Sequence, residues 1–381
     1  MRIVYILPEL SHPGGIGRVT SIKANWLAEQ GHDVWIVTAN QCDAPDYFEL
    51  HVSVKRKDFA IGFQSESDNK YFFLKLIRKI GKMRKYRRGL ERFIYEEKPD
   101  VVVSTFTNDS DFLYKLKDGS KKVLEFHFSH DGFKSQIKYG PKTLKNRMLL
   151  TYRMKKHERI AKKYDAFVVL TEEDAKSWKG YGNLHVISNM KTFGCVCRSN
   201  CMAKRVIAVG RLDFQKKFDR LVDIWAMVNK ECPDWRLDIF GQGPDRKNLL
   251  LQIASMGLMD IVKINPPVKN ILEELLNSSI LAMTSTYEGW GLVLVEAMSA
   301  GIPCVAYACK CGPRDIIDDG QNGFLIEEND MQLFAKRLVE LIKNEALRRK
   351  MGKKALESSH KYDVDRIMNT WVCLFEELLR R

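Results

Sequence analysis

The chain has 381 residues, of which 45% are hydrophobic and 29% charged, and its formal net charge is +14. This composition is typical of a folded protein in water and excludes a largely disordered chain. No apolar run reaches the roughly 18–20 residues of a transmembrane helix. Residues 1–8 form too short an apolar stretch for a signal peptide, and the nine cysteines have no regular spacing, so we expect a cytoplasmic protein.

Apolar runs alternate with helical stretches along the first half of the chain, which is typical of a parallel sheet with crossover helices. The predicted strands are 3–7, 34–38, 101–104, 122–126, 166–170 and 186–189. The predicted helices are 17–30, 72–97, 144–163 and 172–179. Residues 190–202 show no periodicity and are predicted to be a linker.

The same alternation restarts in the second half. The predicted strands are 206–209, 236–240, 262–264, 281–284 and 303–307, and the predicted helices are 218–229, 246–256, 271–277, 292–300 and 331–344. We therefore predict an α/β protein with two domains, residues 1–190 and residues 203–363. On pattern alone, a last helix at 364–381 could belong to either domain.

Most of the positive charge lies in two stretches of the first half. Residues 70–98 hold eleven basic and three acidic side chains, and residues 134–163 hold eleven and one. Apolar residues recur at helical spacing in the first stretch. We predict a basic amphipathic helix that meets an anionic partner, which could be lipid headgroups, a phosphorylated substrate or nucleic acid. The alternative is a core-facing helix with a solvated basic face.

Nothing in the sequence predicts a metal site. The cysteine groups at 195–201 and 309–311 do not follow the usual pairing of zinc ligands, so we predict free, partly buried thiols. The triplet D-S-D at 109–111 has the letters of a metal-binding motif but does not end a predicted strand. We predict that this triplet is a solvated loop.

A glycine-rich turn, G-G-I-G-R at 14–18, follows the first predicted strand and opens the first helix. Glycines let the backbone approach a ligand, and free N–H groups at a helix amino terminus attract an anion. The spacing differs from the dinucleotide pattern G-x-G-x-x-G, and T-A-N at 38–40 replaces the ribose-binding acid that follows the second strand. The sequence therefore disfavours a nicotinamide dehydrogenase.

The segment G-R-L-D-F-Q-K at 210–216 follows the first strand of the second half. Arg211 and Lys216 would point into the crevice at the carboxyl ends of the strands, where open α/β sheets bind ligands. Two cations there can hold a diphosphate and neutralise its charge as it leaves. The alternative is a pair of surface cations on a loop.

The segment E-G-W-G-L-V-L-V-E at 288–296 links a predicted strand to a helix. Its glycines predict a tight loop whose N–H groups crown the helix amino terminus. Glu288 would lie at the mouth of the crevice, and Glu296 would project toward it from the helix. Two carboxylates beside an anion site can accept hydrogen bonds from sugar and ribose hydroxyls. The alternative is that Glu288 is a local cap and that Glu296 pairs with a cation.

Taken together, these motifs resemble those of the retaining GT-B glycosyltransferases of family four. The resemblance spans nearly the whole chain, and the combination is specific although no single motif is. It rests on G-G at 14–15, G-R-L-x3-K at 210–216, E-x7-E at 288–296, C-G-P-R-D-I-I at 311–317, and shorter matches at 168–172, 187–189, 322–325 and around Trp371. The chain departs from the pattern at Ser188, Met190, Lys217 and Trp290, and none of these departures removes a charged group that the site needs.

The resemblance implies two Rossmann-like domains that face each other across a donor cleft, with the last helix returning to the first domain. It assigns Arg211 and Lys216 to the donor diphosphate, Glu296 to the ribose hydroxyls and Glu288 to the donor sugar. The full implied donor set is Gly15, Gly210, Arg211, Lys216, Glu288, Gly289, Trp290, Gly291, Leu292 and Glu296. The implied catalytic set is His127, Arg211, Lys216 and Glu288.

The role of His127 stays open at this point. The resemblance places it near the reacting centre, where it could donate to a sugar hydroxyl or act through its backbone carbonyl. A structural histidine is the alternative, and Glu125 and His130 are neighbours that could take its place.

The implied reaction is a same-face displacement in which the departing diphosphate accepts the acceptor's proton, without a metal or other cofactor. The resemblance favours a UDP-hexose or UDP-N-acetylhexosamine donor and a saccharide or lipid-linked acceptor in polysaccharide or lipopolysaccharide synthesis. The basic stretches 70–98 and 134–163 favour a peripheral location at the inner face of the membrane, and no nucleic-acid partner is expected. The alternatives are another nucleotide-sugar enzyme, such as an epimerase, and a non-enzymatic membrane- or nucleic-acid-binding protein.

Overall fold

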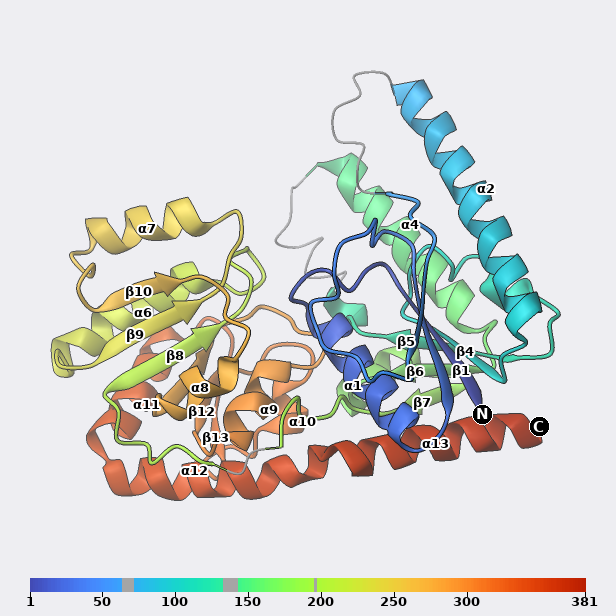
Figure 1. Cartoon of the computed structure of the whole chain (residues 1–381). Helices are drawn as coiled ribbons and strands as arrows, with labels where there is room; N and C mark the ends of the chain where they lie inside the picture. The colour runs from blue at the N-terminus through green and yellow to red at the C-terminus, as the bar shows by residue number, and fades with distance from the viewer. Residues whose placement is uncertain (64–71, 133–142, 195–196) are drawn as a thin grey trace.

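The computed structural model describes residues 1–63, 72–132, 143–194 and 197–381, and these residues form two α/β domains (Figure 1). The first domain is built on a sheet in the order β3-β2-β1-β4-β5-β6-β7, in which every pairing is parallel. Its strands are β1 (Arg2–Leu7), β2 (Asp33–Thr38), β3 (Lys55–Asp58), β4 (Val101–Ser104), β5 (Lys121–Phe126), β6 (Ala166–Val169) and β7 (Leu184–Val186).

The second domain repeats this architecture with a parallel sheet in the order β10-β9-β8-β11-β12-β13. Its strands are β8 (Arg205–Val209), β9 (Arg236–Phe240), β10 (Val262–Asn265), β11 (Ile280–Met283), β12 (Cys304–Tyr307) and β13 (Gly323–Ile326). The predicted α/β fold with two parallel sheets is confirmed.

Helices cover the two sheets. Those of the first half are α1 (Gly15–Glu29), α2 (Phe72–Glu97), α4 (Leu144–Ala161) and α5 (Glu172–Ala175), with 3-10 turns η1 (Leu113–Lys115) and η2 (Lys176–Trp178). Those of the second half are α6 (Phe218–Glu231), α7 (Arg246–Ser255), α8 (Ile271–Leu276), α9 (Leu292–Ser299), α10 (Pro313–Ile316), α11 (Met331–Lys343), α12 (Glu345–Ser359), η3 (His360–Tyr362) and α13 (Val364–Arg380).

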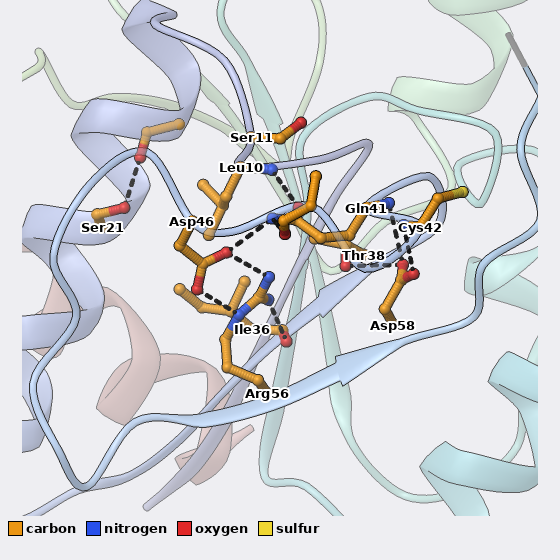
Figure 2. Close-up of polar contacts among 12 residues, drawn as sticks. Leu10, Ser11, Ser21, Ile36, Thr38, Gln41, Cys42, Asp46, Arg56 and Asp58 are labelled. Atoms are coloured by element: carbon orange, nitrogen blue, oxygen red, sulfur yellow. Dashed lines mark hydrogen bonds and ion pairs between the residues drawn. The ribbon is translucent and has the colours of Figure 1, made fainter.

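The edge strand β3 is not predicted by the apolar pattern, because its sequence, K-R-K-D, is entirely charged. Polar contacts hold it in place (Figure 2). The Arg56 guanidinium donates to Asp46 at 2.8 Å and to the carbonyl oxygen of Ile36 at 2.9 Å. The Asp58 carboxylate accepts from the Thr38 hydroxyl at 2.9 Å and from the backbone N–H of Gln41 at 3.2 Å. This strand is therefore specified by side-chain hydrogen bonds and not by an apolar pattern.

Three further elements, β13, α10 and α12, are absent from the predicted helices and strands. The run G-F-L-I of β13 is short and overlaps the motif at 322–325. Helix α12 begins directly after α11, since the Asn344 side chain accepts from the backbone N–H of Leu347 and caps the new helix. The predicted helix at 331–344 corresponds to α11, and the helix α12 that follows the Asn344 cap was not predicted.

The last helix returns to the first domain, where it packs beside α1 (Figure 1). One apolar face of α13, which includes Trp371 and Phe375, is buried in the same core as strands β1, β4 and β5. The Trp26 ring nitrogen on α1 donates to Asp365 at 2.7 Å. The chain therefore starts and ends in the same domain.

Candidate active site

A cavity of about 1340 Å³ lies between the two domains at the carboxyl ends of both sheets. Segments that directly follow strands supply much of its wall, such as His127 after β5 and Gly210 after β8. Every residue that the sequence assigns to the donor or to catalysis lines it: Gly15, His127, Gly210, Arg211, Lys216, Glu288, Gly289, Trp290, Gly291, Leu292 and Glu296. The neighbours Glu125 and His130 are not among the lining residues.

Lys216 is held tightly at the cavity wall. Its Nζ lies 2.6 Å from Glu288 Oε1, and the two side chains are 16% and 9% exposed. Thr284 directly follows the neighbouring strand β11, and its hydroxyl donates to the Lys216 carbonyl at 2.9 Å. The Asp213 carboxylate accepts from the backbone N–H of Gln215 at 3.1 Å, which fixes the turn. The ammonium group is therefore preorganised beside a carboxylate.

Arg211 is placed differently from Lys216. Its side chain is 69% exposed, and its Nε donates to Asp213 Oδ2 at 2.5 Å. The guanidinium lies at the rim of the cavity with most of its surface in solvent. Both cations line the site as predicted, but only Lys216 is fixed deep in its wall.

The glycine loop brings the two domains into backbone contact. A Cβ atom on Gly289 would lie 2.1 Å from the carbonyl oxygen of His127, so only glycine allows this approach. Gly291 has φ +100°, a left-handed conformation that favours glycine, and it is the N-cap of α9. Gly291, Leu292 and Val293 at the amino end of α9 line the cavity together with Lys216. The first N–H groups of a helix have no carbonyl partner in a preceding turn. Trp290 is 3% exposed and packs against the Tyr362 ring.

Glu296 joins the two walls of the cavity. Its Oε1 accepts from Arg18 Nη1 of the first domain at 2.7 Å and from the Thr192 hydroxyl at 2.7 Å. Burial raises the pKa of Glu296, and the Arg18 charge and the Thr192 hydrogen bond act in the opposite direction. The sequence left open whether Glu296 pairs with a cation, and in this structure it pairs with Arg18. Sequence reasoning gave no role to Arg18, although it lies in the G-G-I-G-R motif, and nothing in the sequence singled out Thr192.

The side chain of His127 is almost fully buried, although the residue lines the cavity. Its side chain is 3% exposed, and its Nε2 lies 3.2 Å from Glu125 Oε1. The same carboxylate oxygen contacts the ammonium group of Lys23, and both Lys23 and Glu125 are fully buried. Burial raises the pKa of Glu125, but the charges of His127 and Lys23 outweigh that effect and lower it to about 2. Lys23 escapes prediction, because a single lysine within an apolar helix pattern carries no signal.

His130 belongs to a different network. Its backbone N–H donates to Asp174 Oδ1 at 2.8 Å, and its Nε2 lies 3.1 Å from Glu158. These contacts hold the start of the segment after β5 against α4 and α5. Of the two alternatives to His127, Glu125 therefore lies directly beneath it, and His130 lies outside the cavity lining.

A second cavity of about 340 Å³ adjoins the first on the side of the first domain. The two share Phe106, Asn108, Lys156 and His157 in their walls. Burial and the neighbouring Lys156 charge lower the pKa of His157 to about 4, so it is neutral at pH 7. The α4 side chains of this wall escape prediction, since they lie within a stretch whose only signal is its charge.

The triplet at 109–111 is not the solvated loop that we predicted. Asp109 is fully buried, its carboxylate contacts the Thr107 hydroxyl, and burial raises its pKa. Asp111 pairs with Lys156 on α4. In the part of the chain that the structure describes, no group of three or more His, Cys, Asp or Glu side chains could hold a metal ion.

Two family models match the chain once each. Residues 198–358 match the model of glycosyl transferases group 1, and residues 13–190 match the model of Glycosyltransferase Family 4. Together the two matches cover nearly all of both domains. The chain belongs to the group 1, family 4 glycosyltransferases.

Relatives and solved structures agree with this family. The amylovoran biosynthesis glycosyltransferase AmsD of Erwinia amylovora is 28% identical over 380 residues, 97% of this chain and 98% of its own. The fold is similar to that of a TarM variant of S. aureus, solved with fondaparinux, alpha-GlcNAc-glycerol and UDP (TM-score 0.78, 16% identity, 98% and 99% of the chains). It is also similar to Anabaena HepE, solved with UDP and glucose (TM-score 0.74, 17% identity, 99% and 100%). The predicted GT-B fold is confirmed.

Proposed function

We propose that this chain moves a hexose or N-acetylhexosamine from a UDP-sugar to a saccharide or lipid-linked acceptor in cell-surface polysaccharide synthesis. One observation carries the proposal: a single cavity gathers Lys216, Arg211, the amino end of α9 and two carboxylates. Cations and helix N–H groups suit a diphosphate, and Glu288 and Glu296 suit sugar and ribose hydroxyls. The structures of TarM and HepE with UDP support the donor, and the amylovoran relative supports the pathway class.

The proposed reaction retains the configuration at the sugar's anomeric carbon. The bond from that carbon to the diphosphate oxygen breaks, and the bond to the acceptor oxygen forms on the same face. The acceptor's proton passes to the departing diphosphate. Lys216, Arg211 and the N–H groups of α9 stabilise the negative charge that grows on the leaving group.

A donor panel tests this function. Purified protein is incubated with UDP-glucose, UDP-galactose, UDP-N-acetylglucosamine and GDP-mannose, and released nucleotide and sugar are followed by NMR. We expect slow release of UDP from at least one donor, with the sugar's initial anomeric configuration retained. An epimerase would change the sugar without releasing nucleotide, and a purely binding protein would leave every donor intact.

Activity is expected to survive chelation. Fixed cations and helix N–H groups can take the place of a metal at the leaving diphosphate. We expect the same rate of UDP release with and without EDTA. A rate that falls on chelation and returns with magnesium or manganese would contradict this part of the proposal.

We also propose that the first domain docks on an anionic membrane that carries the acceptor. Figure 1 shows the first turns of α2 and α4 extending beyond the sheet on the same side of the molecule. Both helices expose apolar side chains there: Ile77, Ile80, Leu144, Met148, Leu149 and Tyr152. Exposed cations accompany them: Arg78, Lys79, Arg84, Lys85, Arg147 and Lys155. The predicted basic stretches lie partly outside the described residues, at 70–71 and 134–142.

The charge of this surface sets the expected affinity. Each engaged cation contributes roughly 1 kcal/mol near an anionic leaflet, so about five contribute ~5 kcal/mol, which weakens as salt screens the charges. No helix among the described residues is long and apolar enough to cross a membrane. Docking is therefore expected to be reversible.

Liposome sedimentation tests this docking. Binding should require anionic lipid, weaken at high salt and fall when Arg78 and Lys79 are both changed to Glu. A matched control changes Lys350 and Lys353, exposed on α12 of the second domain, to Glu. Equal binding to neutral liposomes, or equal loss in both variants, would contradict docking through the first domain and favour a soluble acceptor.

A further inference from the structure

Three segments far apart in the chain meet beneath His127. Lys23 comes from α1, Glu125 from the end of β5, and Trp371 from the returning helix α13. All three side chains are fully buried. The Lys23 ammonium contacts Glu125 and lies 3.9 Å from the centre of the Trp371 ring. A cation is thus enclosed between a carboxylate and an aromatic face inside the first domain.

This arrangement is costly if it serves the fold alone. Removing two charges from water costs several kcal/mol per ion, and an apolar pair of the same volume often stabilises a protein as well or better. The core around the pair is apolar and could accept such a replacement. The retained charges therefore call for another role, and the nearest functional group is His127.

The strand geometry connects the pair to His127. Side chains two residues apart on a strand point to the same face, so Glu125 shares with Val123 the face of β5 that packs against α1 and α13. His127 directly follows this strand. Glu125 Oε1 lies 3.2 Å from His127 Nε2, which is ion-pair distance without the geometry of a hydrogen bond. Neither His127 Nε2 nor the other carboxylate oxygen, Oε2, has a hydrogen-bond partner among the described residues. A buried carboxylate without a neighbouring cation would take up a proton, and it would then no longer attract the imidazole ring electrostatically. Lys23 supplies that cation.

We propose that Glu125 is a positioning residue for His127 and that Lys23 and Trp371 hold Glu125 in place as an ionised group. The returning helix α13 then supports the reaction centre as well as the fold. This inference rests on the proposed function and on the place near the reacting centre that the family resemblance implies for His127. The backbone carbonyl oxygen of His127 also lies against Gly289. The position of the His127 backbone therefore bears on the approach of the second domain.

Variants that replace a charged side chain by an uncharged one of similar size test the inference. Glu125→Gln and Lys23→Met each leave one buried charge alone and should lower the melting temperature. The double variant K23M/E125Q removes both charges and should recover most of that loss. Turnover for UDP release is measured at a temperature at which circular dichroism shows every variant folded. We expect all three to lose about 10²-fold in kcat with little change in KM, the scale of a misplaced reacting group.

A matched control lies at the other end of the same strand. Lys122 and Asp118 form a buried ion pair at the start of β5, with 2.5 Å between Nζ and Oδ1. The double variant K122M/D118N should keep kcat within about twofold of the wild type. A return of kcat to the wild-type value in K23M/E125Q, or an equal loss in the control, would show that the Lys23–Glu125 pair is structural only.

A double-mutant cycle with His127 separates positioning from other effects. If Glu125 acts through His127, the variant H127Q/E125Q should be no slower than H127Q alone. Additive losses would overturn the inference. The proposed function fails separately, since wild-type protein would then release no nucleotide from any donor.

Discussion

At the residue scale, Lys216 and Arg211 differ in how far the protein holds them. Lys216 is mostly buried and ion-paired with Glu288, whereas the Arg211 side chain is largely in solvent. A fixed charge contributes more to a transition state than one that must first be ordered. The structure therefore ranks two cations that the sequence could not tell apart.

Substitution of either cation tests the diphosphate site. We expect Lys216→Ala to cut UDP release by about 10³-fold and Arg211→Ala by about 10²-fold, the range for losing one electrostatic partner of a transition state. Lys204→Ala is the control, because that side chain is 62% exposed outside the cavity and pairs with Asp234. Wild-type turnover in both cavity variants would remove the donor-site assignment.

Residue contacts also mark the limit of sequence reasoning. The motifs placed all the predicted donor residues around one cavity, because loops after parallel strands meet at the same edge of a sheet. The pair of Arg18 and Glu296 joins positions 278 residues apart, and the buried Lys23 meets Glu125 across 102. No local spacing carries such pairings. They follow only when two domains, or a helix and a strand, are placed in space.

At the element scale, periodicity predicted most helices and strands, and β4 and α2 have the predicted bounds. It missed the charged edge strand β3, which is not amphipathic, and it missed the helix α12, which begins directly after the Asn344 cap. The alternative of a core-facing α2 holds only for part of the helix, since Ile77 and Ile80 are exposed. Its first turns extend beyond the sheet that its later turns cover.

The packing of α13 predicts that the returning helix stabilises the first domain. Trp371 is fully buried in the core shared with β1, β4 and β5. We expect Trp371→Ala to lower the free energy of unfolding by about 3–5 kcal/mol, the usual cost of deleting a large buried side chain. Leu379→Ala on the same helix is the control, since Leu379 is 39% exposed. Urea unfolding followed by fluorescence measures both, and equal small effects would contradict a structural role for this face.

At the scale of the whole molecule, the two domains meet where backbone contacts backbone. A Cβ on Gly289 would force the His127 carbonyl away and hold the domains farther apart. We therefore expect Gly289→Ala to lower kcat by about 10²-fold or more, because small displacements of reacting groups are costly. The melting temperature should change little.

A glycine in open space provides the matched control for this variant. A Cβ atom on Gly182 would meet no other heavy atom within 4 Å, so Gly182→Ala should keep wild-type activity. Full activity of Gly289→Ala would show that the close approach of the domains is not needed for turnover.

The most direct measurement is a crystal structure of this protein with UDP bound. We predict the diphosphate beside Lys216 and the amino end of α9, the ribose hydroxyls at Glu296, and Arg18 in or near contact with the nucleotide from the opposite wall. UDP bound away from this cavity, or held by one domain without Lys216 or Glu296, would contradict a donor site between the two domains.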